Sequence, residues 1–442
     1  MFPVTRPNRQ AAASIALLVL TVIPTAYVAW TAWSIGRPGH RREVEVRMGR
    51  LLGLQATIQS VRYPQPGEVV YEGVVFRQEE PRSKGLIEVA RARFVRLRKG
   101  DRELAIEAEG LSVRAESPRG AMAQVAALLR RSGESDYERV SLTAPSCDLD
   151  LGAGVEPYQL REVVGIFNPD AAGPNIHASY RVVFPGASTR CELTLCRDRT
   201  AESVRTTLAF KTMEGLPLPA RVLDPFFDTK SWLGFDARVE GALTLRQDGS
   251  KDWEAEFEGD LHQIDLEEMV TRRFPNHRLR GKARLAIALA RWAERPGQGY
   301  GWVEARGELS AGPGTIGQGL LHALNTEMKF RNAPRVARAI SAGQTDLDFR
   351  ALSLAFAMTS DGEIKLKGAL GSEFADNLVL AGATSPLAYA PEGAANVRGL
   401  IKSLFPVTAI NHADMVPLTE KSRLLLCLPV PADVASQSIG GN

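Results

Sequence analysis

Apolar and polar residues alternate along most of this chain with a period of two. From Trp253 to Leu261, the odd positions are apolar or small and the even positions carry Glu254, Glu256, Glu258 and Asp260. This alternation predicts a strand with one apolar and one polar face. The same pattern returns at residues 235–246, 279–289, 303–311 and 352–370. The chain is therefore expected to be mostly β, with a long antiparallel sheet.

Turns and glycines refine this prediction. Asp248-Gly249 and Asp361-Gly362 predict hairpin turns, since both residue types tolerate a positive φ. Glycine on the inner face of a strand lets the strand bend. Four glycines fall on the apolar side of the alternation: Gly241, Gly259, Gly281 and Gly307. A sheet built this way can therefore curl.

The remaining pattern predicts further strands and few helices. Strands are expected at residues 51–63, 69–76, 87–98, 104–115, 140–151, 178–184, 189–197 and 204–211. Helices are expected at residues 121–131, 318–329, 335–342 and 396–404. The proline-rich segment 216–227 predicts a seam between a β-rich half at 43–215 and a β-meander half at 228–434, and residues 435–442 read as a disordered tail.

The N-terminus predicts a membrane anchor. From Ala11 to Trp33 the chain runs 23 residues without a charge. As a helix this spans roughly 34 Å, enough for a bilayer core of about 30 Å. We therefore predict a transmembrane helix within residues 11–35, after a cytoplasmic segment 1–10. A cleaved signal peptide is the alternative, but its A-x-A site is not clean here. The anchor side chains would be Ile15, Leu17, Leu18, Val19, Leu20, Val22, Ile23, Tyr27, Trp30 and Trp33.

Basic residues follow the anchor. Arg37, Arg41 and Arg42 could contact anionic lipid headgroups, or they could be ordinary charges that end a transmembrane helix. Counted against Arg6 and Arg9, the arginines after the anchor favour a cytosolic C-terminal part. Long domains can override that rule, so the count leaves the orientation open.

Composition and motifs argue against several function classes. The net charge of +3 and the lack of a basic block exclude nucleic acid as an expected partner. The six histidines show no metal spacing and there is no nucleophile elbow, so no enzyme, metal or cofactor is predicted. The stretch GPGTIG, Gly312 to Gly317, matches a nucleotide-binding pattern, but its half-polar neighbours favour a loop before a helix.

The four cysteines show no metal spacing either. Cys191 and Cys196 should point to opposite faces of one strand, so they cannot pair with each other. Four buried thiols, or one tertiary disulfide that involves Cys147 or Cys427, fit the sequence.

The apolar face of these strands needs a cover. The candidates are a second sheet, the same sheet rolled on itself, or a non-protein ligand such as lipid chains. Periodicity does not decide between them.

A family resemblance bears on this choice. It is carried by the anchor, by GLQATIQSVRYPQPGEVVYEGVVF from Gly53, by LGFDARVEGALTL and WEAEFEGDLHQIDL, and by GQGLLHALN followed by FRALSLAFAMTSDGEIKLKGAL. With these features the chain resembles the AsmA-like proteins of bacterial envelopes, which are related to TamB and to bridge-like lipid-transfer proteins. The resemblance implies a repeating β-groove, a periplasmic body on a single-pass inner-membrane anchor, and lipid transfer or outer-membrane homeostasis.

We therefore expect a non-enzymatic protein that binds and transfers phospholipid acyl chains in a hydrophobic β-groove. The alternative is an envelope assembly scaffold whose apolar face is filled by its own side chains and which binds envelope proteins or itself. The expected groove lining is Phe235, Val239, Leu243, Trp253, Phe257, Leu261, Leu285, Ile287, Val303 and Leu309.

Overall fold

The fold is seen in a computed structural model of the 442-residue chain. The structure describes residues 14–35, 37–52, 54–79, 86–115, 129, 137–152, 156–185, 187–224, 228–249, 253–274, 276–295, 299–370 and 377–404. The chain separates into two compact units, one formed by residues 1–100 and 105–114 and the other by residues 101–104 and 115–442. The expected disordered tail, 435–442, and Cys427 lie outside the described residues.

The first unit packs a helix on a small antiparallel sheet. Its helix and strands are α3 (Pro38–Leu52), β1 (Gln55–Thr57), β2 (Ser60–Arg62), β3 (Glu68–Glu79), β4 (Leu86–Lys99), most of β5 (Glu103–Glu109) and β6 (Leu111–Arg114). The long strand β3 pairs with β1, β2 and β4, and β4 also pairs with β6. Val44 and Met48 of α3 pack against a buried cluster of Ile58, Val69, Tyr71 and Val74.

Helix α3 corrects the prediction of a strand from residue 51. Leu51 and Leu52 end this helix, and the strands start only at Gln55. Helix α3 begins with Pro38. Proline is favourable at the first helical position because an N–H there would have no intrahelical acceptor. This helix was missed in the sequence analysis because it is rich in arginine and has few apolar side chains, such as Val44 and Met48.

The N-terminal segment is helical but interrupted. Residues 14–17 are α-helical, η1 (Leu18–Val22) is a π-helical turn, and α2 (Ile23–Ile35) continues from it. Within the described part of the chain, no single helix is both long and apolar enough to cross a membrane.

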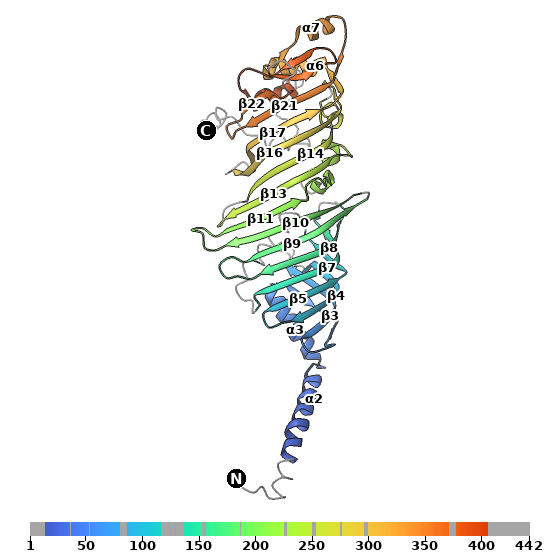
Figure 1. Ribbon diagram of the computed structural model, residues 1–442, viewed down its shortest axis with the longest axis vertical. Coiled ribbons are helices and arrows are strands. Elements are labelled where there is room, and N and C mark those ends of the chain that lie inside the picture. Colours follow the sequence, from blue (N-terminus) through green and yellow to red (C-terminus); the bar gives the residue numbers. More distant parts are fainter. Residues whose placement is uncertain are drawn as a thin grey trace, which may run out of the picture. The chain divides into compact units, whose positions relative to one another are not determined.

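The second unit is built on a long antiparallel meander (Figure 1). Its main strands are β7 (Arg139–Asp150), β8 (Tyr158–Asn168), β9 (Asn175–Phe184), β10 (Ala187–Asp198), β11 (Arg205–Thr212), β13 (Arg238–Asp248), β14 (Glu254–Asp265), β16 (Lys282–Arg295), β17 (Gly299–Ala311), β21 (Ala351–Met358) and β22 (Glu363–Gly368). Each of these pairs antiparallel with the next in this series. The predicted mostly-β fold with a large antiparallel sheet is confirmed.

Shorter elements surround this meander. They are β12 (Leu218–Pro219), η3 (Ala220–Leu223), α5 (Thr229–Leu233), η4 (Glu267–Thr271), β15 (Leu279–Arg280), β18 (Gly314–Gly317), α6 (Gln318–Met328), β19 (Arg331–Asn332), α7 (Pro334–Ser341), β20 (Asp346–Phe349), β23 (Leu378–Ala381), β24 (Pro386–Tyr389), β25 (Ala395–Asn396) and α8 (Val397–Leu404). Strands β15, β18 and β20 form a separate small sheet.

Several sequence predictions are confirmed within the described residues. Helices α6, α7 and α8 match three of the four predicted ranges, and Leu129 is the only described helical residue of the fourth, 121–131. Both Asp-Gly turns connect paired strands. The proline-rich segment 216–227 does not separate two sheets, because β11 and β13 on either side of it pair directly.

The glycine-rich stretch GPGTIG is structural. Its last four residues form β18, which pairs antiparallel with β15 and β20, whereas nucleotide binding would need a parallel unit. A Cβ on Gly314 would lie 2.0 Å from the carbonyl oxygen of Arg280, so glycine permits the close approach of β15.

Candidate functional site

The apolar side chains of the second unit align in rows that cross the sheet. In one row the paired residues are Leu193, Phe210, Leu243, Phe257, Ala290, Ala305, Met358 and Ile364. In a neighbouring row they are Val239, Leu261, Leu285, Leu309 and Leu354. Because residues opposite one another share a face, the register itself assembles one continuous apolar face.

Glycines form the row between these two. Gly241 pairs with Gly259, and Ile287 pairs with Gly259 and Gly307. Gly241 has φ 144° and Gly259 has φ 157°, and a Cβ on either would lie 2.7 Å from the Cα of the other. The Thr212 hydroxyl accepts a 2.8 Å hydrogen bond from the Gly241 N–H. Only glycine allows this conformation and this approach.

One side of the glycine row is covered by the protein itself. Val239 is 5% exposed, Leu261 9%, and Ile264, beyond a bulge at Gln263, 0%. They belong to a large buried cluster with Leu218, Leu233, Leu266, Val270, Phe274 and Leu279 from β12, α5 and the η4–β15 region. We call this part of strands β13 and β14 the capped stretch.

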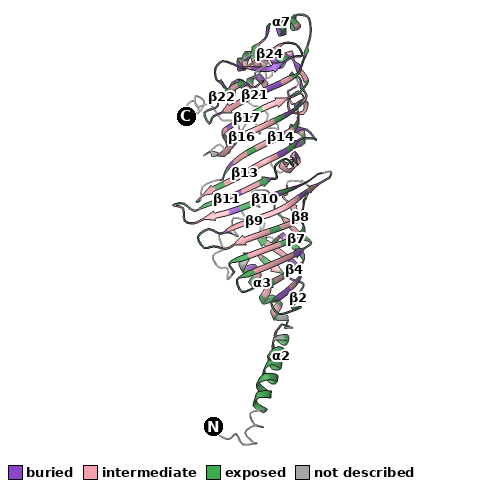
Figure 2. Ribbon diagram, viewed as in Figure 1, coloured by how far each residue is buried: buried purple, intermediate pink, exposed green. Residues whose placement is uncertain are grey.

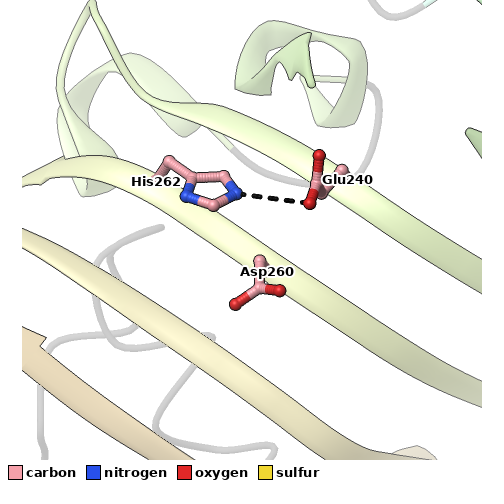
Figure 3. A group of neighbouring side chains, drawn as sticks. All are labelled: Glu240, Asp260 and His262. Atoms are coloured by element: carbon pink, nitrogen blue, oxygen red, sulfur yellow. Dashed lines mark ion pairs between the residues drawn. The ribbon is translucent and has the colours of Figure 1, made fainter. Parts of the chain in front are cut away.

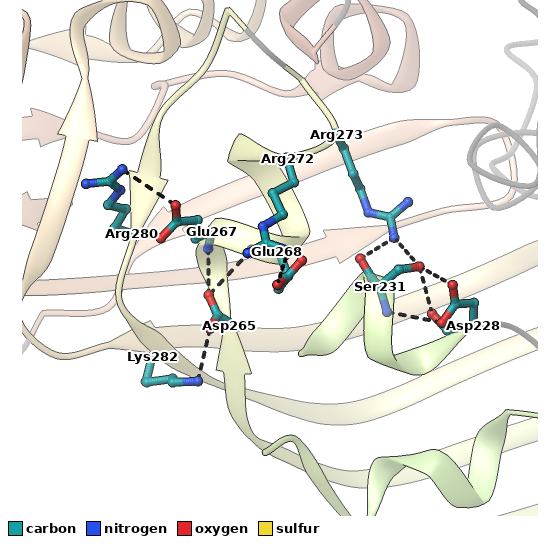
Figure 4. Close-up of polar contacts among 9 residues, drawn as sticks. All are labelled: Asp228, Ser231, Asp265, Glu267, Glu268, Arg272, Arg273, Arg280 and Lys282. Carbon is teal, nitrogen blue, oxygen red and sulfur yellow. Dashed lines mark hydrogen bonds and ion pairs between the residues drawn. The ribbon is translucent and has the colours of Figure 1, made fainter. Parts of the chain in front are cut away.

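Polar contacts hold the cap in place (Figure 4). Asp265 accepts a hydrogen bond of 2.9 Å from the Glu267 N–H and one of 3.0 Å from Lys282 Nζ. Burial raises the pKa of the Asp265 carboxyl, but these hydrogen bonds outweigh burial and hold the pKa below its usual value. Asp265 therefore fixes the start of η4 as a carboxylate.

A second contact joins α5 to η4. The Arg273 guanidinium lies 3.4 Å from the centre of the Trp232 ring and donates a 3.1 Å hydrogen bond to Ser231 Oγ. Asp228 caps α5 by accepting from the Ser231 N–H at 3.1 Å. The hydrogen bond from the Ser231 hydroxyl lowers the pKa of Asp228, so this N-cap residue of α5 is also an ionised carboxylate.

On the other side of the glycine row, Leu243 and Phe257 are only half-buried, and so are large apolar side chains of the same face on the neighbouring strands. Figure 2 shows the central strands mostly at intermediate burial, with buried segments toward the cap. We call these residues the apolar ladder: Phe210, Leu243, Phe257, Leu285, Ile287, Leu309, Leu354 and Phe356. The ladder is thus a continuous apolar surface that the described residues cover incompletely.

The two flanks of the ladder are covered. Leu129 is fully buried against Leu195 and Leu208, and its carbonyl accepts a 2.9 Å hydrogen bond from Arg199. Toward β22, Met328 of α6 and Val397 of α8 belong to a second buried cluster. The ladder therefore lies between covered regions of the same face.

The structure places most of the predicted lining residues on this face. Leu243, Phe257, Leu285, Ile287 and Leu309 lie in the ladder, Val239 and Leu261 lie under the cap, and Val303 is half-buried on β17. Phe235 is a correction, because it lies in a turn before β13 and is 82% exposed. The preceding Gly234 has φ 90° and ends α5, so the strand starts only at Arg238. Trp253 precedes β14 and is half-buried.

The opposite face of the same strands is ionic. Arg284 Nε donates to Asp260 at 2.8 Å, and Arg291 Nη2 donates to Glu256 at 3.0 Å. These cross-strand pairs lie on the face turned away from the ladder, as the alternation predicted.

The predicted anchor side chains are all exposed. Their exposed fractions run from 48% for Val19 to 74% for Leu20. Arg37 stacks on the Trp33 ring at 3.4 Å, and Arg41 pairs with Glu45 at 3.8 Å, while Arg42 is exposed. Arg41 thus already has a protein partner, whereas the predicted headgroup contacts of the three arginines stay predictions.

Cys147, Cys191 and Cys196 are free thiols. Burial raises the pKa of Cys191 to about 12 and that of Cys147 to about 11, so both are protonated and unreactive at neutral pH.

Sequence reasoning missed one group of side chains, Glu240, Asp260 and His262. Their ligand atoms all lie within 4.8 Å of one another. Spacing rules could not find this group because β13 and β14 bring Glu240 to the other two residues across a hairpin. The signal available was the pairing that the Asp248-Gly249 turn imposes.

Comparison of the chain with protein-family models, with curated proteins and with solved structures gave no match.

Proposed function

We propose that this chain is a membrane-anchored lipid-binding and lipid-transfer protein whose apolar ladder contacts acyl chains. The observation that carries the proposal is the half-burial of the ladder residues on a face whose flanks the protein covers itself. Contiguous apolar surface of this kind marks a binding site in soluble proteins.

The physics of the ladder suits an acyl chain. Each CH₂ withdrawn from water contributes about 0.8 kcal/mol, and this gain needs no directional contact. The apolar ladder runs over six strands, from Phe210 on β11 to Leu354 and Phe356 on β21. At about 4.8 Å between strands, it provides an apolar path of roughly 24 Å. A curled sheet that forms a groove along this path would shield a chain from water.

The N-terminal segment is the proposed anchor. Residues 11–35 would insert as one transmembrane helix, and the solvent exposure of the large apolar side chains between Ile15 and Trp33 supports this assignment. Trp30 and Trp33 would lie at the membrane interface, where aromatic side chains are favoured.

The resemblance to AsmA-like proteins suggests a bacterial inner-membrane location with the body in the periplasm. It also suggests a role in outer-membrane or envelope homeostasis without catalysis. A meander of this length favours a short carrier or an oligomeric relay over an unaided bridge between two membranes.

Site-specific photocrosslinking tests the proposal on the full chain. A benzophenone side chain replaces Phe257 in the ladder, and in a matched variant it replaces Ser310 on the polar face of β17. After irradiation in cells, mass spectrometry is expected to find lipid adducts at position 257 and none at position 310. A folded protein without adducts at position 257 would instead support a scaffold whose apolar face is filled by side chains.

A charge substitution provides a second test. Phe257→Glu is expected to abolish lipid co-purification while membrane association is retained. Ser310→Glu adds the same charge on the opposite face, beside Arg284, and is expected to leave lipid loading unchanged.

A further inference from the structure

The polar face of the β13–β14 hairpin carries a group of three potential metal ligands. Glu240 of β13 lies directly opposite Asp260 of β14, and His262 is two residues further along β14. Figure 3 shows the three neighbouring side chains, with a dashed line between the His262 imidazole and the Glu240 carboxylate. His262 Nε2 lies 3.7 Å from Glu240 Oε1, and the ligand atoms of all three lie within 4.8 Å.

One ligand atom of this group has no hydrogen-bond partner in the protein. His262 Nε2 is shielded from solvent and makes no hydrogen bond. Glu240 and Asp260 are carboxylates at directly opposite positions, where like charges destabilise a strand pair. A bound cation would satisfy both conditions at once.

Arg284 holds one of the three potential ligands, Asp260, in place by a hydrogen bond. Its Nε donates to Asp260 Oδ1 at 2.8 Å, which leaves the second carboxylate oxygen available. Hydrogen bonds of this kind to a ligating carboxylate are a regular feature of metal sites, because they fix the ligand's orientation. Arg284 and the exposed Arg238, opposite His262, also reduce the net negative charge around the group.

We propose that Glu240, Asp260 and His262 bind one divalent transition-metal ion, with Zn²⁺ as the best match. One imidazole and two carboxylates are ligands that Zn²⁺ accepts, whereas Ca²⁺ and Mg²⁺ prefer oxygen ligands only. Around a tetrahedral Zn²⁺ the ligand atoms are about 3.3 Å apart. The 3.7 Å between His262 Nε2 and Glu240 Oε1 is already close to this separation.

The ion would join β13 and β14 at the point where the glycines Gly241 and Gly259 provide no side-chain contact on the apolar face. Glu240 and Asp260 are the chain neighbours of Gly241 and Gly259, the glycine row of the sheet. A metal bridge there would stabilise the close approach of β13 and β14 at the glycine row. This site goes beyond lipid binding and does not depend on it.

Zn²⁺ titration of the full chain tests the proposal. After chelator treatment and dialysis, calorimetry is expected to show one Zn²⁺ equivalent whose binding is lost in His262→Ala and weakened at least tenfold in Glu240→Gln. The controls His322→Ala and His177→Ala remove exposed histidines outside the group and are expected to bind like the original chain. Binding that survives His262→Ala, or the absence of any saturable site, would overturn the proposal.

A spectroscopic measurement avoids dependence on the folding of variants. Co²⁺ added to the full chain is expected to give the d–d absorption of a site with nitrogen and oxygen ligands, and one Zn²⁺ equivalent should displace it. A spectrum of hexaaquo Co²⁺ at one equivalent would contradict the proposal. Lipid crosslinking at position 257 is read separately, so failure of one assignment leaves the other intact.

Discussion

The capped stretch and the apolar ladder share strands β13 and β14, the same face and the same alternation. They differ in what lies above them. Val239 and Leu261 are buried under β12, α5 and η4, whereas Leu243 and Phe257, four residues away on each strand, are half-buried. The pattern within a strand therefore determines which face is apolar, and segments outside the strand determine whether that face is covered.

A substitution in the glycine row, which separates the two stretches on β13 and β14, is expected to have the largest effect on stability. In Gly259→Val the new Cβ would lie 2.1 Å from the Glu240 carbonyl oxygen at φ 157°, so β13 and β14 could not approach. We expect a loss of unfolding free energy of about 4 kcal/mol or more, measured by urea denaturation. Gly173→Ala, where no atom lies within 4 Å of the new Cβ, should cost less than about 0.5 kcal/mol. Equal losses in both variants would contradict the close-approach argument.

Truncations in the two stretches should separate stability from lipid binding. Ile264→Ala, under the cap at 0% exposure, is expected to cost about 3 kcal/mol of unfolding free energy with lipid loading retained. Phe257→Ala, in the ladder, should cost less than half of that because its side chain is already in part solvated, yet reduce co-purifying lipid. If Phe257→Ala proved the more destabilising, the ladder would be an ordinary core.

Acidification should weaken the cap through His277. This side chain is 2% exposed, and burial lowers its pKa, although the backbone of Ser403 and Leu404 opposes the shift. The unfolded chain then binds the proton more readily, so stability is complete above the usual pKa of about 6.5 and is lost as pH falls below it. Thermal melts at pH 8 and pH 5.5 should show this loss, which His277→Gln should reduce and the exposed His322→Gln should not.

The hydrogen bonds at the start of η4 predict a smaller effect. Asp265→Asn removes the carboxylate that accepts from Lys282 and Glu267, and is expected to cost about 1–2 kcal/mol near pH 7. Since the folded pKa of Asp265 is lowered, its contribution is present above about pH 4 and disappears as the carboxylate protonates. The difference between variant and original chain should therefore shrink in melts at pH 3, and a constant difference would rule out the ionic contribution.

The smallest expected effect is a difference in the rates at which the cysteine thiols are labelled. In a Cys427→Ser background, the half-buried Cys196 is expected to react first with a thiol reagent at pH 8. Cys191 and Cys147 should react only on unfolding, because burial keeps them protonated and shielded. Rapid labelling of Cys191 in the folded protein would show that the sheet opens at β10.

The sequence predicted what depends on period and turn chemistry. Most of the long strands, both Asp-Gly hairpins and helices α6 to α8 follow from local patterns, whereas β8 was not predicted. The cap could not be predicted, since Leu218, Leu233 and Leu266 come from short segments whose burial depends on tertiary contacts. Phe235 shows the same limit, because its alternation continues that of β13 but Gly234 ends α5 just before it. The Glu240–Asp260–His262 group required the exact register across the hairpin.

The meander also bears on how the chain acquires its structure. Most of its pairings join strands that follow one another in the sequence, so each needs only a short loop to close. Short loops carry a small entropic cost, and each strand emerging from the ribosome finds the preceding strand already present as a template. Three pairings span longer segments, those of β11 with β13, β14 with β16 and β17 with β21. The segment 312–350 that precedes β21 is the longest of the three. We therefore expect co-translational order to advance strand by strand, with its longest pause after β17, until β21 has been synthesised.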